Sequence, residues 1–283
     1  NILEETNSFE LHITDKEELA GLPESLIEMA YMEAERRKKQ GWVFTLHFPS
    51  YIPFMQYSER RDLREKMLKA YSSRAFRGND FDNSQNALKI ADLRLEIARM
   101  LGFSTFAEMI LVDRMADTKE KVEIFLEKLF QASKPAAFRD FDNIRSFAES
   151  SGHKGAIERW DWAYWSEKLK KKLYNIDDEI LKPYFSLENV EAAIFGLATS
   201  LYGIRFSKND SIPIYTGEVK TFEVYDRDDS LLSILYIDYH PRPGKNGGAW
   251  MTSYREQKIE NGNDVRPLIS IVANFTRPTE TRP

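Results

Sequence analysis

The chain has 283 residues, of which 42% are hydrophobic and 30% are charged, and its formal net charge at pH 7 is -5. This composition is typical of a globular protein with a sizeable core. It lacks the basic excess of a nucleic-acid-binding protein, it has no cysteine for a disulfide or thiolate site, and it has no apolar run of about 18 residues that would span a membrane.

The N-terminal two-thirds of the sequence is typical of helices. Thr14 and Glu17 have the spacing of a capping box, in which two side chains satisfy each other's free backbone N–H groups. Pro23 suits the first turn of a second helix, and that helix is expected to end in a basic turn before Gly41. These signals predict a helical beginning to the fold.

Residues 42–48 alternate between large apolar and other side chains, which predicts a strand that Pro49 and Pro53 end. Helical periodicity then returns and continues to about residue 204. Within this part, Asp161 is expected to cap one helix and Ser186 to open another.

After residue 205 the pattern changes to short β-rich runs. The predicted strands are 212–215, 221–225, 232–238 and 268–275. The sequence therefore predicts a mainly α fold with a small mixed β-sheet in the C-terminal third. We expect a helical domain over 1–204 and a β-rich part over 205–283.

Few residues in the sequence suggest a catalytic centre. No histidine is followed by glutamate and no two histidines lie four residues apart, so the zinc-binding pattern His-Glu-x-x-His is absent. The Gly-x-Ser-x-Gly pattern of serine hydrolases and the phosphate-binding glycine loop are also absent. A lone histidine is more often a packed or surface residue than a ligand. We assign no catalytic and no metal-binding residue in this chain.

Residues 239–252, YHPRPGKNGGAWMT, are unusual because two adjacent glycines follow two strand-like runs. Glycine allows another backbone to approach closely, and it adopts conformations that other residues avoid. Gly247 and Gly248 therefore suit a place where a second backbone comes close. The alternative is that they only form a turn or bulge where a strand begins.

The segment Gly247-Gly-Ala-Trp-Met251 resembles the thimet-oligopeptidase family of zinc peptidases. The resemblance is strongest to bacterial peptidyl-dipeptidases, also called dipeptidyl carboxypeptidases, and it covers essentially the whole chain. Other segments agree in the order in which the family has them, among them Phe44–Leu46, Pro49–Met55, Tyr236–Asp238, Arg266–Pro267 and Asn274–Phe275.

The resemblance implies a piece of a zincin-like oligopeptidase fold that ends before the His-Glu-x-x-His helix. We therefore expect zinc in the parent protein, none bound to this chain, and no activity of this chain alone. The resemblance also implies that Gly247, Gly248 and Ala249 contact the substrate backbone, with Trp250 packed behind them. No metal ligand or catalytic group of the family can be placed on this sequence.

The function expected from the resemblance is that of a hydrolase that releases dipeptides from the C-terminus of oligopeptides. One alternative is an oligopeptidase of the same family that cuts internally, and another is a non-catalytic helical binding or scaffold module. The expected partners are short peptides, without nucleic acid or membrane. A monomer in the cytoplasm or periplasm of a bacterium is expected, with no choice between the compartments.

Overall fold

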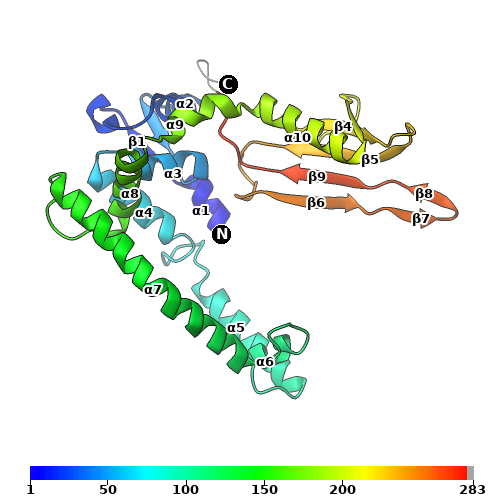
Figure 1. Ribbon diagram of the computed structural model, residues 1–283, viewed down its shortest axis with the longest axis horizontal. Helices are drawn as coiled ribbons and strands as arrows, with labels where there is room; N and C mark the ends of the chain where they lie inside the picture. Colours follow the sequence, from blue (N-terminus) through cyan, green and yellow to red (C-terminus); the bar gives the residue numbers. More distant parts are fainter. Residues whose placement is uncertain (279–283) are drawn as a thin grey trace. The chain divides into compact units, whose positions relative to one another are not determined.

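The computed structural model describes residues 1–278, and it is mainly helical with a small mixed sheet in the C-terminal region (Figure 1). This architecture confirms the predicted fold class. The chain divides into two compact units. Unit 1 contains Asn1–Glu5 and Arg61–Leu173, and unit 2 contains Thr6–Arg60 and the residues from Tyr174 onward. The expected domain division after residue 204 stays a prediction.

Unit 1 is built from helices. After the start of α1 (Ile2–Ser8), its elements are α4 (Arg61–Ser72), α5 (Ser84–Met100), α6 (Phe106–Leu111), α7 (Lys119–Ser150) and α8 (Arg159–Tyr174). Ile144 and Ala148 of α7 form a buried cluster with Tyr164 and Trp165 of α8. This cluster joins the end of the long helix α7 to α8.

Asp161 lies inside the first turn of α8, so the prediction that it precedes and caps this helix is wrong. Its carboxylate accepts a hydrogen bond from the backbone N–H of Glu158 at 3.0 Å. It also pairs with Arg61 at 2.8 Å and with Arg64 at 3.0 Å, and it is fully buried. A carboxylate in the first turn can reach back to a free N–H, as the second residue of a capping box does.

Unit 2 begins with a small α/β part. Its elements are β1 (Leu11–Ile13), the 3₁₀-helix η1 (Lys16–Leu19), α2 (Glu24–Arg36), β2 (Trp42–Phe44) and α3 (Phe48–Tyr57). The helix predicted after Pro23 is confirmed as α2. The N-cap of η1 is Asp15, which accepts from the N–H of Glu17 at 2.9 Å, so Thr14 is not the cap.

The strand predicted over 42–48 is only partly correct, because β2 ends at Phe44 and α3 begins at Phe48. Pro49 lies in the first turn of α3, where its missing N–H costs no hydrogen bond. Pro53 lies inside the helix and does remove one. The buried side chain of Phe54 packs edge-on against Phe44 with the ring centroids 4.8 Å apart, which anchors the helix.

The second part of unit 2 begins with α9 (Asp178–Leu181) and the 3₁₀-helix η2 (Lys182–Phe185), which lead to α10 (Leu187–Tyr202). The hydroxyl of Ser186 accepts from the backbone N–H of Asn189, as the sequence predicts for a helix that opens here. Gly203 ends α10 in the left-handed conformation, with a φ of 76°.

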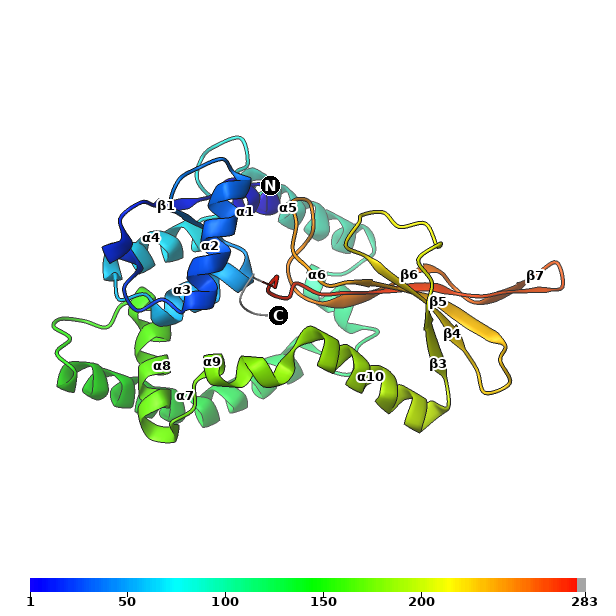
Figure 2. The same cartoon turned by 90° about the horizontal axis from the view of Figure 1, so that it is seen from above.

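A five-stranded mixed sheet follows α10, with the strand order β3-β4-β5-β9-β6. The strands are β3 (Arg205–Lys208), β4 (Lys220–Tyr225), β5 (Leu231–Asp238), β6 (Trp250–Arg255) and β9 (Leu268–Val272). β5 and β9 are parallel, and the other neighbours are antiparallel. A two-stranded hairpin of β7 (Lys258–Glu260) and β8 (Asn263–Val265) extends beyond the end of this sheet (Figure 2).

The strands predicted over 221–225, 232–238 and 268–275 are confirmed as β4, β5 and β9, although β9 ends at Val272. The strand predicted over 212–215 is wrong, because this segment forms no strand. Pro213 cannot donate to a ladder, and the hydroxyl of Tyr215 bonds to Asp238 instead.

One face of the sheet is covered by α10 (Figure 1). Phe195 of α10 stacks on Phe206 with a centroid distance of 4.1 Å and meets Phe222 edge-on at 5.0 Å. Leu235 and Ile237 of β5 complete this buried cluster. Among the described residues, β6 pairs only with β9, so it is an edge strand of the sheet.

No helix in the described part of the chain has the length and apolar character needed to cross a lipid bilayer.

Candidate functional site

The predicted peptide-contacting residues lie where the chain enters the edge strand β6. Gly247 and Gly248 form a bend, Ala249 follows it, and Trp250 is the first residue of β6. The φ of Gly248 is 100°, in the left-handed region that side chains other than that of glycine rarely adopt. The glycine pair therefore turns the chain into the strand, while Ala249 and Trp250 lie at the start of the exposed edge.

Residues 239–249, here called the glycine loop, connect β5 to β6. The loop begins with a tight turn in which the N–H of Lys245 donates to the carbonyl of Arg242 at 3.1 Å. Pro243 and Gly244 occupy the two central positions, and the φ of Gly244 is 83°. Proline followed by a glycine with positive φ is typical of a type II turn. The Pro-Gly sequence thus determines where the loop reverses.

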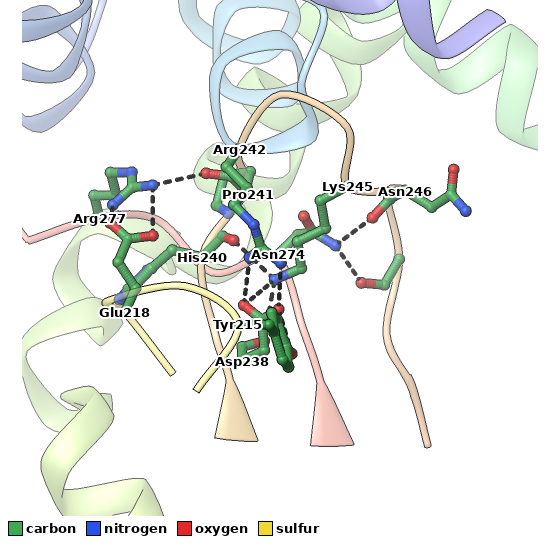
Figure 3. Close-up of polar contacts among 11 residues, drawn as sticks. Tyr215, Glu218, Asp238, His240, Pro241, Arg242, Lys245, Asn246, Asn274 and Arg277 are labelled. Carbon is green, nitrogen blue, oxygen red and sulfur yellow. Dashed lines mark hydrogen bonds and ion pairs between the residues drawn. The ribbon is translucent and has the colours of Figure 1, made fainter. Parts of the chain in front are cut away.

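A buried carboxylate lies beneath this turn. Asp238, the last residue of β5, accepts two hydrogen bonds from the guanidinium of Arg242, both at 2.8 Å (Figure 3). The hydroxyl of Tyr215 donates to the same carboxylate at 2.9 Å, and the ammonium of Lys245 donates at 2.8 Å. Burial would raise the pKa of Asp238, but the hydrogen bonds from Arg242, Lys245 and Tyr215 lower it to about 2.

The ammonium of Lys245 also binds the loop backbone. It donates to the carbonyl of Asp238 at 3.1 Å and to that of His240 at 2.8 Å. With the carboxylate, these contacts give each of its three N–H bonds an acceptor. Burial lowers the pKa of Lys245, and the hydrogen bond to Asp238 opposes this effect. The side chain is therefore an internal cation that links residue 245 to residues 238–240, on the opposite side of the loop.

Asn274 fixes the other end of the glycine loop. Beyond the end of β9, the N–H of Phe275 still donates to the carbonyl of Tyr239 at 2.8 Å, so the chain stays beside the loop. The side-chain amide of Asn274 donates to the carbonyl of Asn246 at 3.0 Å and to that of Gly248 at 2.7 Å (Figure 3). One side chain thus orients two carbonyls on either side of Gly247.

The backbone carbonyl of Gly248 is hydrogen-bonded, whereas the backbone N–H groups of the glycine pair are not hydrogen-bonded within the described residues. The carbonyl of Gly248 is bound by Asn274. Among the described residues, the backbone N–H groups of Gly247 and Gly248 have no hydrogen-bond acceptor. A Cβ atom on Gly248 would meet no heavy atom within 4 Å, and one on Gly247 would meet the Phe48 ring at 3.7 Å. The glycine pair is therefore accessible to another chain, because its surroundings leave open space.

A cavity of about 470 Å³ adjoins the glycine loop through Pro241 and Pro243. Its other walls include Met29 and Met32 of α2 and the side chain of His47. This volume suits a small ligand or a few side chains of a peptide. The cavity adds a concave, partly apolar surface to the loop side of the sheet.

The polar side chains that shape the loop, Asp238 and Asn274, were not predicted from the sequence as site residues. Asp238 and Asn274 each follow a strand-like apolar run directly or within two residues. A charged or amide side chain at that position, next to the end of a strand, is a signal that could have indicated them. In the loop itself, the buried Nδ1 of His240 has no hydrogen-bond partner among the described residues, and burial lowers the pKa of this side chain.

The described residues do not fit a catalytic metal ion. A zinc site needs three or four converging side chains of histidine, cysteine, aspartate or glutamate. No three such residues come together in residues 1–278 in a way that could hold a metal ion. The carboxylate of Asp238 is already bound by two cations and a hydroxyl.

Comparison with known proteins gives a family match over most of the chain. The sequence model of the family described as "Peptidase family M3" matches residues 54–283. The chain is 35% identical to Oligopeptidase A of Salmonella typhimurium over 100% of its own length and 42% of that protein. It is 38% identical to the organellar oligopeptidase A of Arabidopsis thaliana, again over its whole length, which is 37% of that protein.

The chain is also similar to the dipeptidyl carboxypeptidase of Escherichia coli, at 30% identity over 96% of the chain and 40% of that protein. The chain thus spans about two-fifths of the length of the relatives that it matches.

Proposed function

The chain belongs to peptidase family M3, and we propose that in the whole protein it supplies the edge strand that holds a peptide substrate by its backbone. One observation carries the proposal: β6 has a single strand neighbour among the described residues, and an accessible glycine pair leads into it. An edge strand offers a row of free N–H and C=O groups to an extended peptide. Such pairing reads the backbone and tolerates varied side chains.

Gly247, Gly248 and Ala249 are the proposed backbone contacts, with Trp250 packed behind them. The positive φ of Gly248 explains why this position suits glycine, and the free N–H groups of the pair are potential donors to a peptide carbonyl. The neighbouring cavity of about 470 Å³ would accept substrate side chains. A turn that merely starts the strand is the alternative, since the bend at the glycine pair also serves that purpose.

The family and the names of the relatives favour a peptidase over a non-catalytic scaffold for the whole protein. We propose that it hydrolyses short peptides as an oligopeptidase that cuts internally. This choice rests on the oligopeptidase A proteins reported above, which share 35% and 38% identity with the chain, against 30% for the dipeptidyl carboxypeptidase. Release of dipeptides from the C-terminus, the function expected from the sequence, is the second candidate.

Peptidases of family M3 are generally zinc-dependent. Because residues 1–278 provide no set of zinc ligands, we expect the ligands of the whole protein elsewhere. The contribution proposed for this chain is to bind and orient the peptide, and it requires no metal contact. The absence of bound zinc and of activity in this chain alone, the monomeric state, and the bacterial cytoplasm or periplasm all stay predictions.

The test is hydrolysis by the whole protein of a ten-residue peptide in two forms, one with a free C-terminal carboxylate and one with a C-terminal amide. Mass spectrometry of early products distinguishes the candidates. Internal cleavage of both forms supports the oligopeptidase. Successive loss of dipeptides from the free form, with the amide resistant, would instead establish dipeptide release. Absence of hydrolysis of either form would contradict the proposed function.

A further inference from the structure

Side chains bind several carbonyls at the start of the glycine loop and within it. The Lys245 ammonium binds the carbonyls of Asp238 and His240. The guanidinium of Arg277 binds the carbonyl of Pro241 at 2.8 Å. The Asn274 amide binds the carbonyls of Asn246 and Gly248 (Figure 3). Side chains thus help to fix the direction of these peptide groups, and the carbonyl of Asp238 is also bound by the backbone N–H of Ala273 at 2.8 Å.

A peptide group is planar, so fixing its carbonyl also fixes the direction of its N–H. The Gly248 carbonyl belongs to the peptide group whose N–H is that of Ala249, and the Asn246 carbonyl belongs to the group with the N–H of Gly247. Both carbonyls are held by the single amide of Asn274, at 2.7 Å and 3.0 Å. Asn274 therefore sets the orientation of two of the three proposed backbone contacts.

The Lys245 ammonium anchors the glycine loop directly before the segment that Asn274 orients. It is buried, and all three of its acceptors lie in residues 238–240, at the opposite arm of the loop. Its own backbone N–H closes the Pro-Gly turn on Arg242. Hydrogen bonds from both the main chain and the side chain thereby fix the position of Lys245.

We propose that Asn274 and Lys245 are positioning residues, which hold the backbone of residues 246–249 in the orientation that a peptide substrate binds. This inference rests on the proposed function, because binding of a peptide by the glycine loop is part of that function. Preorganised binding groups lose little freedom when the ligand binds, so a loosened loop should bind the peptide less tightly. Neither side chain needs to touch the peptide for this effect.

The test uses Asn274→Asp in the whole protein, with Asn261→Asp as its control. Both substitutions exchange an amide for a carboxylate, but Asn261 lies in the turn between β7 and β8, outside the glycine loop, and its exposed side chain makes no hydrogen bond in the described part of the chain. The carboxylate of Asn274→Asp cannot donate to the two carbonyls and would repel them. Lys245→Met serves as a second variant, because it removes the ammonium and keeps the length of the side chain.

The first readout is amide hydrogen exchange without peptide, followed for the amide of Lys245 and the first amides of β6. We expect exchange about tenfold faster in Asn274→Asp, from the loss of one or two hydrogen bonds, and unchanged exchange in Asn261→Asp. Equal exchange in Asn274→Asp and the unaltered protein would overturn the positioning role. Asn274→Ala replaces Asn274→Asp if the charged variant does not fold.

The second readout is the kinetics of peptide hydrolysis at constant folding, which is checked by the melting temperature. A positioning role predicts a KM raised by about tenfold in Asn274→Asp, a smaller change in kcat, and neither change in Asn261→Asp. Faster exchange with unchanged KM and kcat would overturn the link to the substrate. If the unaltered protein hydrolyses no peptide, the proposed function fails, and the exchange measurement alone then decides the positioning role.

Discussion

Lys245 and Asp238 form an ion pair in which the ammonium lies 2.8 Å from the carboxylate, and the two side chains are only 3% and 2% exposed. The residues lie at the two arms of the glycine loop, so the pair closes the loop at its base. A buried pair of this kind needs further hydrogen bonds to offset the loss of hydration. Here Arg242 and Tyr215 supply them to the carboxylate.

Lys245→Met should lower the free energy of unfolding by about 3 kcal/mol, at the lower end of what breaking a buried ion pair costs, because Arg242 still neutralises Asp238. Urea denaturation of the whole protein measures the change. Lys258→Met is the matched control. Lys258 forms an exposed pair with Glu260, so this variant should be nearly as stable as the unaltered protein. Equal stability of both variants would show that the internal cation does not hold the loop.

Acid should weaken the fold through Asp238. Its pKa in the folded protein is about 2, below the ordinary value of 3.8, so the folded state favours the ionised carboxylate. The resulting stabilisation is present above about pH 4 and is lost as the pH falls towards 2. The stability difference between the unaltered protein and Asp238→Asn should therefore shrink over this window in urea titrations. A difference that stays constant from pH 5 to about pH 2 would contradict this account.

Gly248→Val and Gly247→Val should separate the effect of backbone strain from the effect of blocking the approach of the peptide. Gly248 has a φ of 100°, so valine there should cost about 1–3 kcal/mol of folding free energy and impair peptide turnover strongly. Gly247 has no positive φ, and a Cβ there would make only an ordinary contact with Phe48 at 3.7 Å, so the fold should tolerate its substitution. Gly247→Val should still reduce turnover if the residue contacts the peptide.

Thermal unfolding, bound metal and turnover are measured on both valine variants in the whole protein. Metal content should stay normal, because neither glycine provides a ligand. Full turnover by a folded Gly248→Val protein would contradict the peptide contact and show that the glycine pair only forms the bend before β6.

Much of the fold follows from local patterns. The helix at Ser186, the strand pair 221–225 and 232–238, and the last strand were predictable because capping chemistry and β-branched runs act over a few residues. The strand predicted over 42–48 failed because proline signals are ambiguous. Pro49 is equally compatible with the end of a strand and with the first turn of a helix, and the buried contact of Phe54 with Phe44 decides between them.

The candidate site was only partly predictable. The glycine pair and the Pro-Gly turn are visible in the sequence because both depend on local backbone preferences. The role of Asn274 is not visible, because its amide reaches carbonyls 26 and 28 residues earlier in the chain. That contact exists only because β9 inserts between β5 and β6, and this strand order is a property of the whole sheet.

The most direct test of the central claim is hydrogen exchange of the whole protein with and without a saturating peptide. A chelator is added, and mass spectrometry confirms that the peptide stays intact. Backbone pairing predicts that exchange of edge amides within residues 247–255 slows by about tenfold when the peptide binds. The opposite edge strand, β3 (Arg205–Lys208), should be unaffected and serves as the internal control. Saturated peptide binding with unchanged exchange in residues 247–255 would contradict the account.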